Sequence, residues 1–126
     1  MEVIDLDILK PAGRVIKIDG KSIEISFIPV GITFQVDQIT KKLFEYQKVD
    51  LEADSAKAEE AFDLAVKLCA LFCEKEYPDL NEKWFRSNAT AGQIQVLTGQ
   101  ITKTLTESMQ GLERYAKNAA GAKAKT

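Results

Sequence analysis

A hairpin signature near the amino terminus most constrains the fold of this chain. Residues 14–18 and 21–27 alternate apolar and polar side chains on either side of Asp19-Gly20. Asp-Gly between two such segments is typical of a tight turn between antiparallel strands, because both residues tolerate the positive φ angles that the turn needs. The turn places five apolar side chains on one face: Ile16, Ile18, Ile23, Ile25 and Phe27. This face therefore needs cover from the rest of the chain.

The segment before the hairpin predicts a further strand. Residues 3–9 alternate between apolar side chains and aspartates, which is typical of a half-buried strand. Pro11 and Gly13 then end the pattern. We therefore expect residues 1–30 to be rich in β-structure.

Residues 32–48 carry apolar side chains at three- and four-residue spacing, which favours a helix with Thr33 as its cap. Residues 32–36 also alternate, so a third strand followed by a shorter helix capped by Asp37 remains an alternative. The spacing favours the longer helix.

An acidic connection over residues 49–55 precedes the strongest helical pattern, which covers residues 56–77 and predicts the centre of the core. Asp54 or Ser55 is expected to cap this helix. The acidic spacing is similar to the start of a calcium loop. However, Ser55 stands where the turn glycine belongs and Ala61 where the closing glutamate belongs, so we exclude calcium.

The last helix is predicted from Thr90 to about Lys117. Thr90 with Gln93 three residues later forms a capping-box pattern. The helix carries a near-heptad apolar stripe: Ile94, Leu97, Ile101, Leu105, Met109, Leu112 and Ala116. Such a helix is longer than a small domain needs, so its second half is expected to project. Residues 118–126, rich in alanine and lysine, are expected to form a disordered basic tail.

These patterns predict a single α+β domain over residues 1–117. Its N-terminal β-hairpin or small antiparallel sheet packs on a bundle of three to four α-helices, which occupy residues 31–117. The length of 126 residues suits one hydrophobic core.

Charge and hydropathy exclude several classes of function. The net charge of -2 provides no positive field for nucleic acid. The first residues are acidic where a signal peptide is basic, and no apolar run approaches the roughly 20 residues that span a bilayer. We therefore expect a cytoplasmic protein with neither nucleic acid nor membrane as a partner.

The residue types also argue against catalysis. The chain contains no histidine, which removes the usual general base and the common metal triads. Cys69 and Cys73 lie four apart on one predicted helix face, where we expect them to be buried as small hydrophobes with no metal. We expect no enzyme activity, no cofactor and no metal.

Apolar side chains are then the candidates for partner binding. Trp84 and Phe85 form an aromatic pair in a predicted connection, where they either pack under the loop or belong to a binding surface. The stripe of the last helix buries against the domain or against another copy, so self-association is expected. The candidate partner-binding residues are Trp84, Phe85, Ile94, Leu97, Ile101, Leu105 and Met109.

The layout of the chain resembles a known family. Residues 15–27 (VIKIDGKSIEISF), an apolar middle helix, the aromatic link and residues 90–97 (TAGQIQVL) at the start of the final helix are together similar to tail assembly chaperones of long-tailed, siphovirus-type bacteriophages. The resemblance implies a protein of the bacterial host cytoplasm that binds the tape measure protein and helps tail tube protein polymerise around it. It also implies a minor, longer product made by ribosomal frameshifting near the carboxyl end.

The residues alone leave a second hypothesis open. A chain with apolar helix faces and no catalytic pattern also suits a small helical adaptor or regulatory protein of a phage or bacterium that acts by protein-protein contact.

Overall fold

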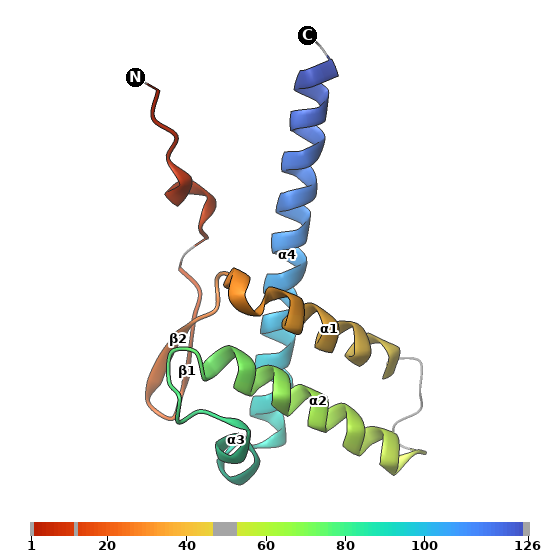
Figure 1. The fold of residues 1–126 in the computed structure, drawn as a ribbon. Helices are drawn as coiled ribbons and strands as arrows, with labels where there is room; N and C mark the ends of the chain where they lie inside the picture. The colour runs from red at the N-terminus through yellow and green to blue at the C-terminus, as the bar shows by residue number, and fades with distance from the viewer. Residues whose placement is uncertain (1, 12, 47–52, 125–126) are drawn as a thin grey trace.

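The computed structural model describes residues 2–11, 13–46 and 53–124. Their elements follow the chain in this order: a short 3-10 helix η1 (Leu6–Leu9), strands β1 (Val15–Ile18) and β2 (Lys21–Glu24), and helices α1 (Val30–Tyr46), α2 (Ser55–Cys73), α3 (Glu82–Asn88) and α4 (Ala91–Ala124). The predicted α+β class, a two-stranded antiparallel hairpin followed by helices, is confirmed (Figure 1).

The hairpin forms as its sequence predicts. Asp19 and Gly20 take φ angles of 52° and 72°, which are the positive values that a two-residue turn of this kind needs. The register pairs Ile16 with Ile23 and Ile18 with Lys21. The apolar face is covered, with three of its isoleucines fully buried: Ile18, Ile23 and Ile25.

The predicted strand over residues 3–9 is wrong. Its second half forms η1, in which the Asp5 side chain accepts a hydrogen bond of 3.0 Å from the Asp7 backbone N–H. The apolar side chains Ile4 and Leu6 are largely exposed. A strand is stable only beside a partner strand, and aspartates offer the backbone a competing local turn. Among the described residues this segment has no partner strand, so its alternating pattern does not form one.

Helix α1 decides between the two alternatives for residues 32–48. It begins at Val30, so the helical prediction is confirmed and the third strand is not formed. The predicted cap is wrong, because Thr33 lies inside the helix. Its hydroxyl donates to the Pro29 carbonyl at 2.9 Å.

Helix α2 is capped by Asp54, as predicted, whose carboxylate accepts a 3.1 Å hydrogen bond from the Lys57 N–H. It ends at Cys73, four residues before the predicted end. Most of the predicted acidic connection, residues 49–52, lies outside the described residues. Helix α2 contacts α1, α3 and α4, which confirms its predicted place at the centre of the core.

Helix α3 falls where a connection was expected. The Asn81 side chain caps it by accepting a 3.0 Å hydrogen bond from the Trp84 N–H. Seven residues are too few to show a helical period in sequence. Phe85 is nevertheless buried on this helix, so the packing alternative for the aromatic pair holds for this residue.

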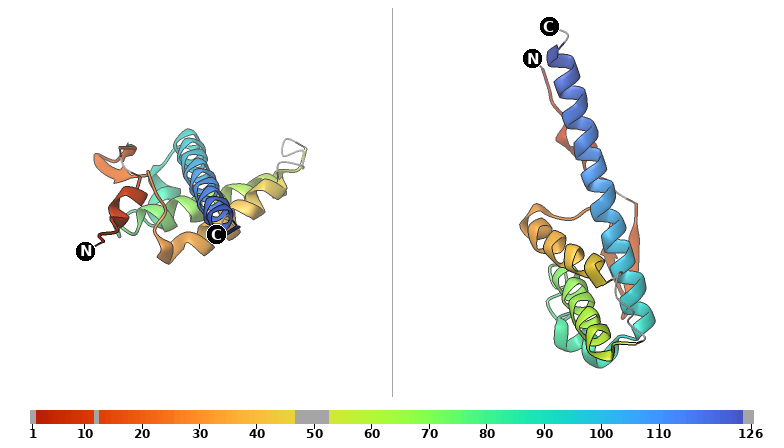
Figure 2. Two further views of the ribbon diagram at one scale, coloured as in Figure 1. Left: turned by 90° about the horizontal axis from the view of Figure 1, so that it is seen from above. Right: turned by 90° about the vertical axis from the view of Figure 1, so that its right-hand side faces the viewer.

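Helix α4 begins with the predicted capping box. The Thr90 hydroxyl accepts from the Gln93 N–H at 3.1 Å, and the Gln93 side chain accepts from the Thr90 N–H at 2.9 Å. The helix continues to Ala124, past the end expected near Lys117 and through most of the expected disordered tail. Alanine and lysine are strong helix formers, so a lack of apolar side chains does not end the helix. Its C-terminal half projects beyond the other helices, as predicted (Figures 1 and 2).

Polar contacts join the hairpin to α4. The Thr104 hydroxyl donates to the Ile25 carbonyl at 2.6 Å, at a buried position. Arg14 forms an ion pair of 3.1 Å with Glu107 and donates to the Gln100 side chain at 2.6 Å. These contacts fix the hairpin against the middle of α4.

An apolar groove between three helices

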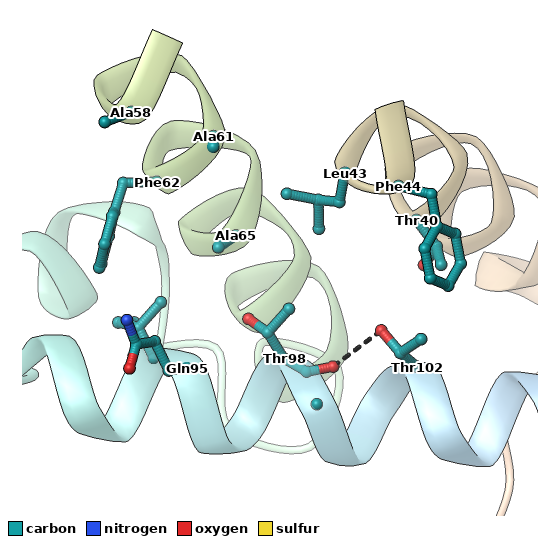
Figure 3. Close-up of a pocket in the computed structure, with 12 residues that line it drawn as sticks. Thr40, Leu43, Phe44, Ala58, Ala61, Phe62, Ala65, Gln95, Thr98 and Thr102 are labelled. Carbon is teal, nitrogen blue, oxygen red and sulfur yellow. Dashed lines mark hydrogen bonds between the residues drawn. The ribbon is translucent and has the colours of Figure 1, made fainter. Parts of the chain in front are cut away.

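A groove of about 580 Å³ lies between α1, α2 and α4 (Figure 3). Helix α4 runs along one side, and Phe62 of α2 and Phe44 of α1 lie toward opposite ends. The apolar lining consists of Leu43, Phe44, Ala58, Ala61, Phe62, Ala65, Ile94 and Gly99. Thr40, Gln95, Thr98 and Thr102 complete it. We call this feature the α1–α2–α4 groove.

Small residues keep the groove open. Ala58, Ala61 and Ala65 lie on one face of α2 at helical spacing, and Gly99 faces them from α4. Side chains of this size leave space that leucine or phenylalanine would fill. They also allow another backbone to approach closely, as small residues do where helices pack tightly. The groove is therefore shaped to admit a further helix or an apolar side chain.

Two aromatic rings at the groove remain accessible to solvent. Phe44 is 46% exposed and Phe62 is 38% exposed. Both rings have large apolar surfaces, so leaving them in water is unfavourable, and contiguous exposed apolar surface is characteristic of interaction sites. These rings make the groove the best-supported binding site in the described chain.

Thr40 is the polar exception in the lining. Its hydroxyl oxygen is buried and has no hydrogen-bond partner among the described residues. An unpaired buried hydroxyl costs roughly 1–3 kcal/mol, so a partner group at this position would be stabilising. Thr40 is therefore a lining residue whose buried hydroxyl is unsatisfied by the described residues.

The other threonines of the groove are already bonded within the protein. The Thr102 hydroxyl donates to the Thr98 carbonyl at 2.9 Å (Figure 3). The Thr98 hydroxyl lies 3.5 Å from the Cys69 sulfur. Thr40 is thus the threonine of the groove whose hydroxyl forms no hydrogen bond with the described residues.

The two cysteines are buried, as predicted. Burial raises the pKa of the Cys69 thiol to about 11 and that of the Cys73 thiol to about 12. Both thiols are therefore protonated at neutral pH, which makes them weak nucleophiles and weak metal ligands. The described residues contain no cluster of three or more histidine, cysteine or carboxylate side chains that could hold a metal ion.

The structure places most of the candidate partner-binding residues in the core. Five of them are buried and pack within this chain: Phe85, Ile94, Leu97, Ile101 and Leu105. Trp84 is half-buried and meets the Phe85 ring edge-on, with ring centroids 5.1 Å apart. Met109 lies on α4, but its side chain is outside the described part. Among those with described side chains, Ile94 alone lines the groove, and the first half of the α4 stripe, from Ile94 to Leu105, is buried within its own domain.

Sequence reasoning missed Phe44 and Thr40 as site residues and placed Phe62 only on a core-facing helix side. Phe44 adjoins the apolar stripe of its helix without belonging to it, which was the available signal. The three alanines on the same face as Phe62 were a second signal, because a helix face without bulk leaves room beside it. Each signal concerns a single helix, so neither predicts that the space between the three helices stays open.

The fold and the groove define a hairpin-and-helix α+β domain with an open apolar cleft between three helices. Comparisons with protein-family models, with curated proteins and with solved structures found no match to this chain. Among the helices that the structure describes, none is both long and apolar enough to cross a membrane. Function is therefore inferred from the groove and from the sequence pattern.

Proposed function

We propose that this chain is a non-enzymatic tail assembly chaperone of a long-tailed bacteriophage, and that it binds the tape measure protein in the α1–α2–α4 groove. The observation that carries the proposal is the groove itself, about 580 Å³ in volume, with the half-exposed rings of Phe44 and Phe62 at its ends. The resemblance of the hairpin and of the start of α4 to the chaperone family supplies the identity of the client.

The segment of the client that fits the groove is an amphipathic helix. An apolar helix face that enters the groove covers Phe44 and Phe62, while the alanines of α2 allow the two helices to pack closely. Covering the exposed part of each ring contributes about 1 kcal/mol, since full burial of a phenylalanine side chain is worth roughly 1.5–3 kcal/mol. Binding of this kind is reversible and consumes no nucleotide.

The proposed cycle of tail assembly follows from reversible binding of this kind. While the groove covers apolar segments of the tape measure protein, these segments cannot aggregate in the host cytoplasm. Tail tube protein then replaces the chaperone as it polymerises around the tape measure. A minor, longer product made by frameshifting belongs to the same proposal, with the additional segment following the projecting end of α4.

Co-expression with a tape measure protein tests this function. We expect a client that aggregates alone to become soluble and to co-purify with this chain. The matched control is the same client expressed with an unrelated small helical protein. A tape measure protein that stays insoluble and unbound would contradict the chaperone function, and specific binding of a different helical client in the same groove would assign the chain to the adaptor class.

A further inference from the structure

Strand β1 has an unpaired edge. In a two-residue hairpin the residues that flank the turn bond to each other, and the bonding positions then recur at every second residue. The Ile25 N–H donates to the Arg14 carbonyl at 2.9 Å, which fits this alternation. The backbone groups of Val15 and Lys17 therefore point away from β2. Within residues 13–46 and 53–124, no hydrogen bond is made to them.

The other edge of the hairpin is partly occupied by side-chain contacts. The Tyr77 hydroxyl donates to the Ser22 carbonyl on the outer side of β2 at 3.1 Å. Lys21 places its ammonium group 6.0 Å from the centre of the Tyr77 ring. The β1 edge, with no such contact to its outward backbone groups among the described residues, is thus the more open of the two, and open edges are templates for strand pairing.

Space for a strand lies directly beside β1. A second cavity of about 320 Å³ is bordered by residues 16–18 and by the start of α4, including Val96. Val96 is 66% exposed and Val15 is 59% exposed. A neighbouring strand lies about 4.8 Å from β1, where it would enter this cavity and cover both valines.

We propose that β1 pairs in antiparallel fashion with β1 of a second copy of this chain, which joins the two hairpins into a four-stranded sheet around a two-fold axis. Val15 of each copy bonds to Lys17 of the other through the backbone, giving four hydrogen bonds. The two Ile16 side chains meet at the axis. The pairing is isologous, as a two-fold interface requires.

Charge favours this register when the occupant of the edge is a second copy of the chain. The alternative symmetric registers make two hydrogen bonds between the strands, and one of them sets Lys17 against Lys17. In the proposed register Lys17 lies opposite Val15, so no like charges oppose each other. Arg14 is already held by Glu107 at 3.1 Å and adds no free charge at the edge. The edge is therefore complementary to itself.

The pairing leaves the α1–α2–α4 groove open. The two cavities share no lining residue. A dimer formed through β1 would therefore present two client sites, and the inference stands whether or not the client is a tape measure protein.

Amide hydrogen exchange combined with light scattering tests the pairing. We expect a species of twice the 14.0 kDa chain mass, in which the Val15 and Lys17 amides exchange slowly, and fast exchange of both amides after dilution to the monomer. A monomer at every concentration would overturn the proposal. So would a dimer in which these two amides still exchange freely.

A matched pair of variants tests the register. Val15→Lys places two ammonium groups opposite each other at two symmetric positions, so we expect the dimer dissociation constant to rise about tenfold. Val15→Glu places a carboxylate opposite Lys17, and the constant should stay equal or fall. Circular dichroism of each variant checks that the exposed position leaves the fold intact. Equal effects of the two substitutions on the dissociation constant would exclude the proposed register.

Discussion

Thr40 shows how a single residue can lower stability at a binding site. Its buried hydroxyl has no partner among the described residues. Replacing it with the near-isosteric side chain in Thr40→Val should raise the free energy of unfolding by about 1 kcal/mol, because an unsatisfied polar group is removed. Urea denaturation followed by circular dichroism measures the change.

The control for Thr40 is Thr102→Val at the same groove. The Thr102 hydroxyl already donates to the Thr98 carbonyl, so this substitution should bring no gain in stability. Equal stability changes for the two variants would show that the Thr40 hydroxyl is satisfied in solution.

The buried thiols predict a pH dependence of stability. Burial raises the pKa values of Cys69 and Cys73 from 9.0 to about 11 and about 12. The unfolded chain therefore releases protons first, so this contribution to stability is complete below about pH 9 and is lost as the pH rises through 11 to 12.

The double variant Cys69→Ala, Cys73→Ala isolates the thiol contribution. Lysines and tyrosines also titrate in this range, and they are common to both proteins. We expect the free energy of unfolding to fall less steeply between pH 9 and 11 in the variant than in the parent chain. Parallel curves from urea denaturation at each pH would mean that the thiols are not protected in the folded state.

Secondary-structure elements with local signals were predictable from sequence. The Asp19-Gly20 turn and the helix caps at Asp54 and Thr90 depend on residues within a few positions of each other, so sequence specifies them. The 3-10 helix η1 shows the opposite case. Its alternating pattern predicted a strand, but the outcome depended on a partner strand that no local pattern reveals.

The groove was less predictable than the fold for the same reason. Exposure of Phe44 depends on the distances between three helices, and sequence periodicity gives only the face of each helix. The stripe of α4 was identified correctly as apolar, and its first half, from Ile94 to Leu105, packs within this domain. Sequence thus identified which faces are apolar but not which of them remain uncovered.

The capping box should stabilise the first turn of α4 and thereby the whole domain. Thr90→Ala removes the hydroxyl that accepts from the Gln93 N–H, so the free energy of unfolding should fall by about 1 kcal/mol. Ser108→Ala, at an exposed position of the same helix, is the control and should change little. Thermal or urea unfolding measures both, and a Thr90→Ala protein as stable as the control would exclude a contribution from the cap.

For the whole molecule, the projecting end of α4 is separable from the folded domain. Figure 1 shows this end extending past the other helices. Deleting residues 118–126 should leave the melting temperature unchanged within about 1 °C, because a projecting helix end adds little burial. A cut at residue 102 instead removes the buried Thr104 and Leu105 and should unfold the domain. A fall of several degrees on the shorter deletion would mean that the end packs in solution.

The central claim is that the α1–α2–α4 groove holds a client helix. The direct test is the affinity of a soluble tape measure segment for Phe44→Asp and Phe62→Asp, with Phe34→Asp as the matched control. Phe34 is on α1 and is 78% exposed, but it does not line the groove. Calorimetric titration should show at least a tenfold loss of affinity for the two groove variants and none for the control, because a client would bury the new charge only in the groove. Equal affinities for all three variants would contradict the claim.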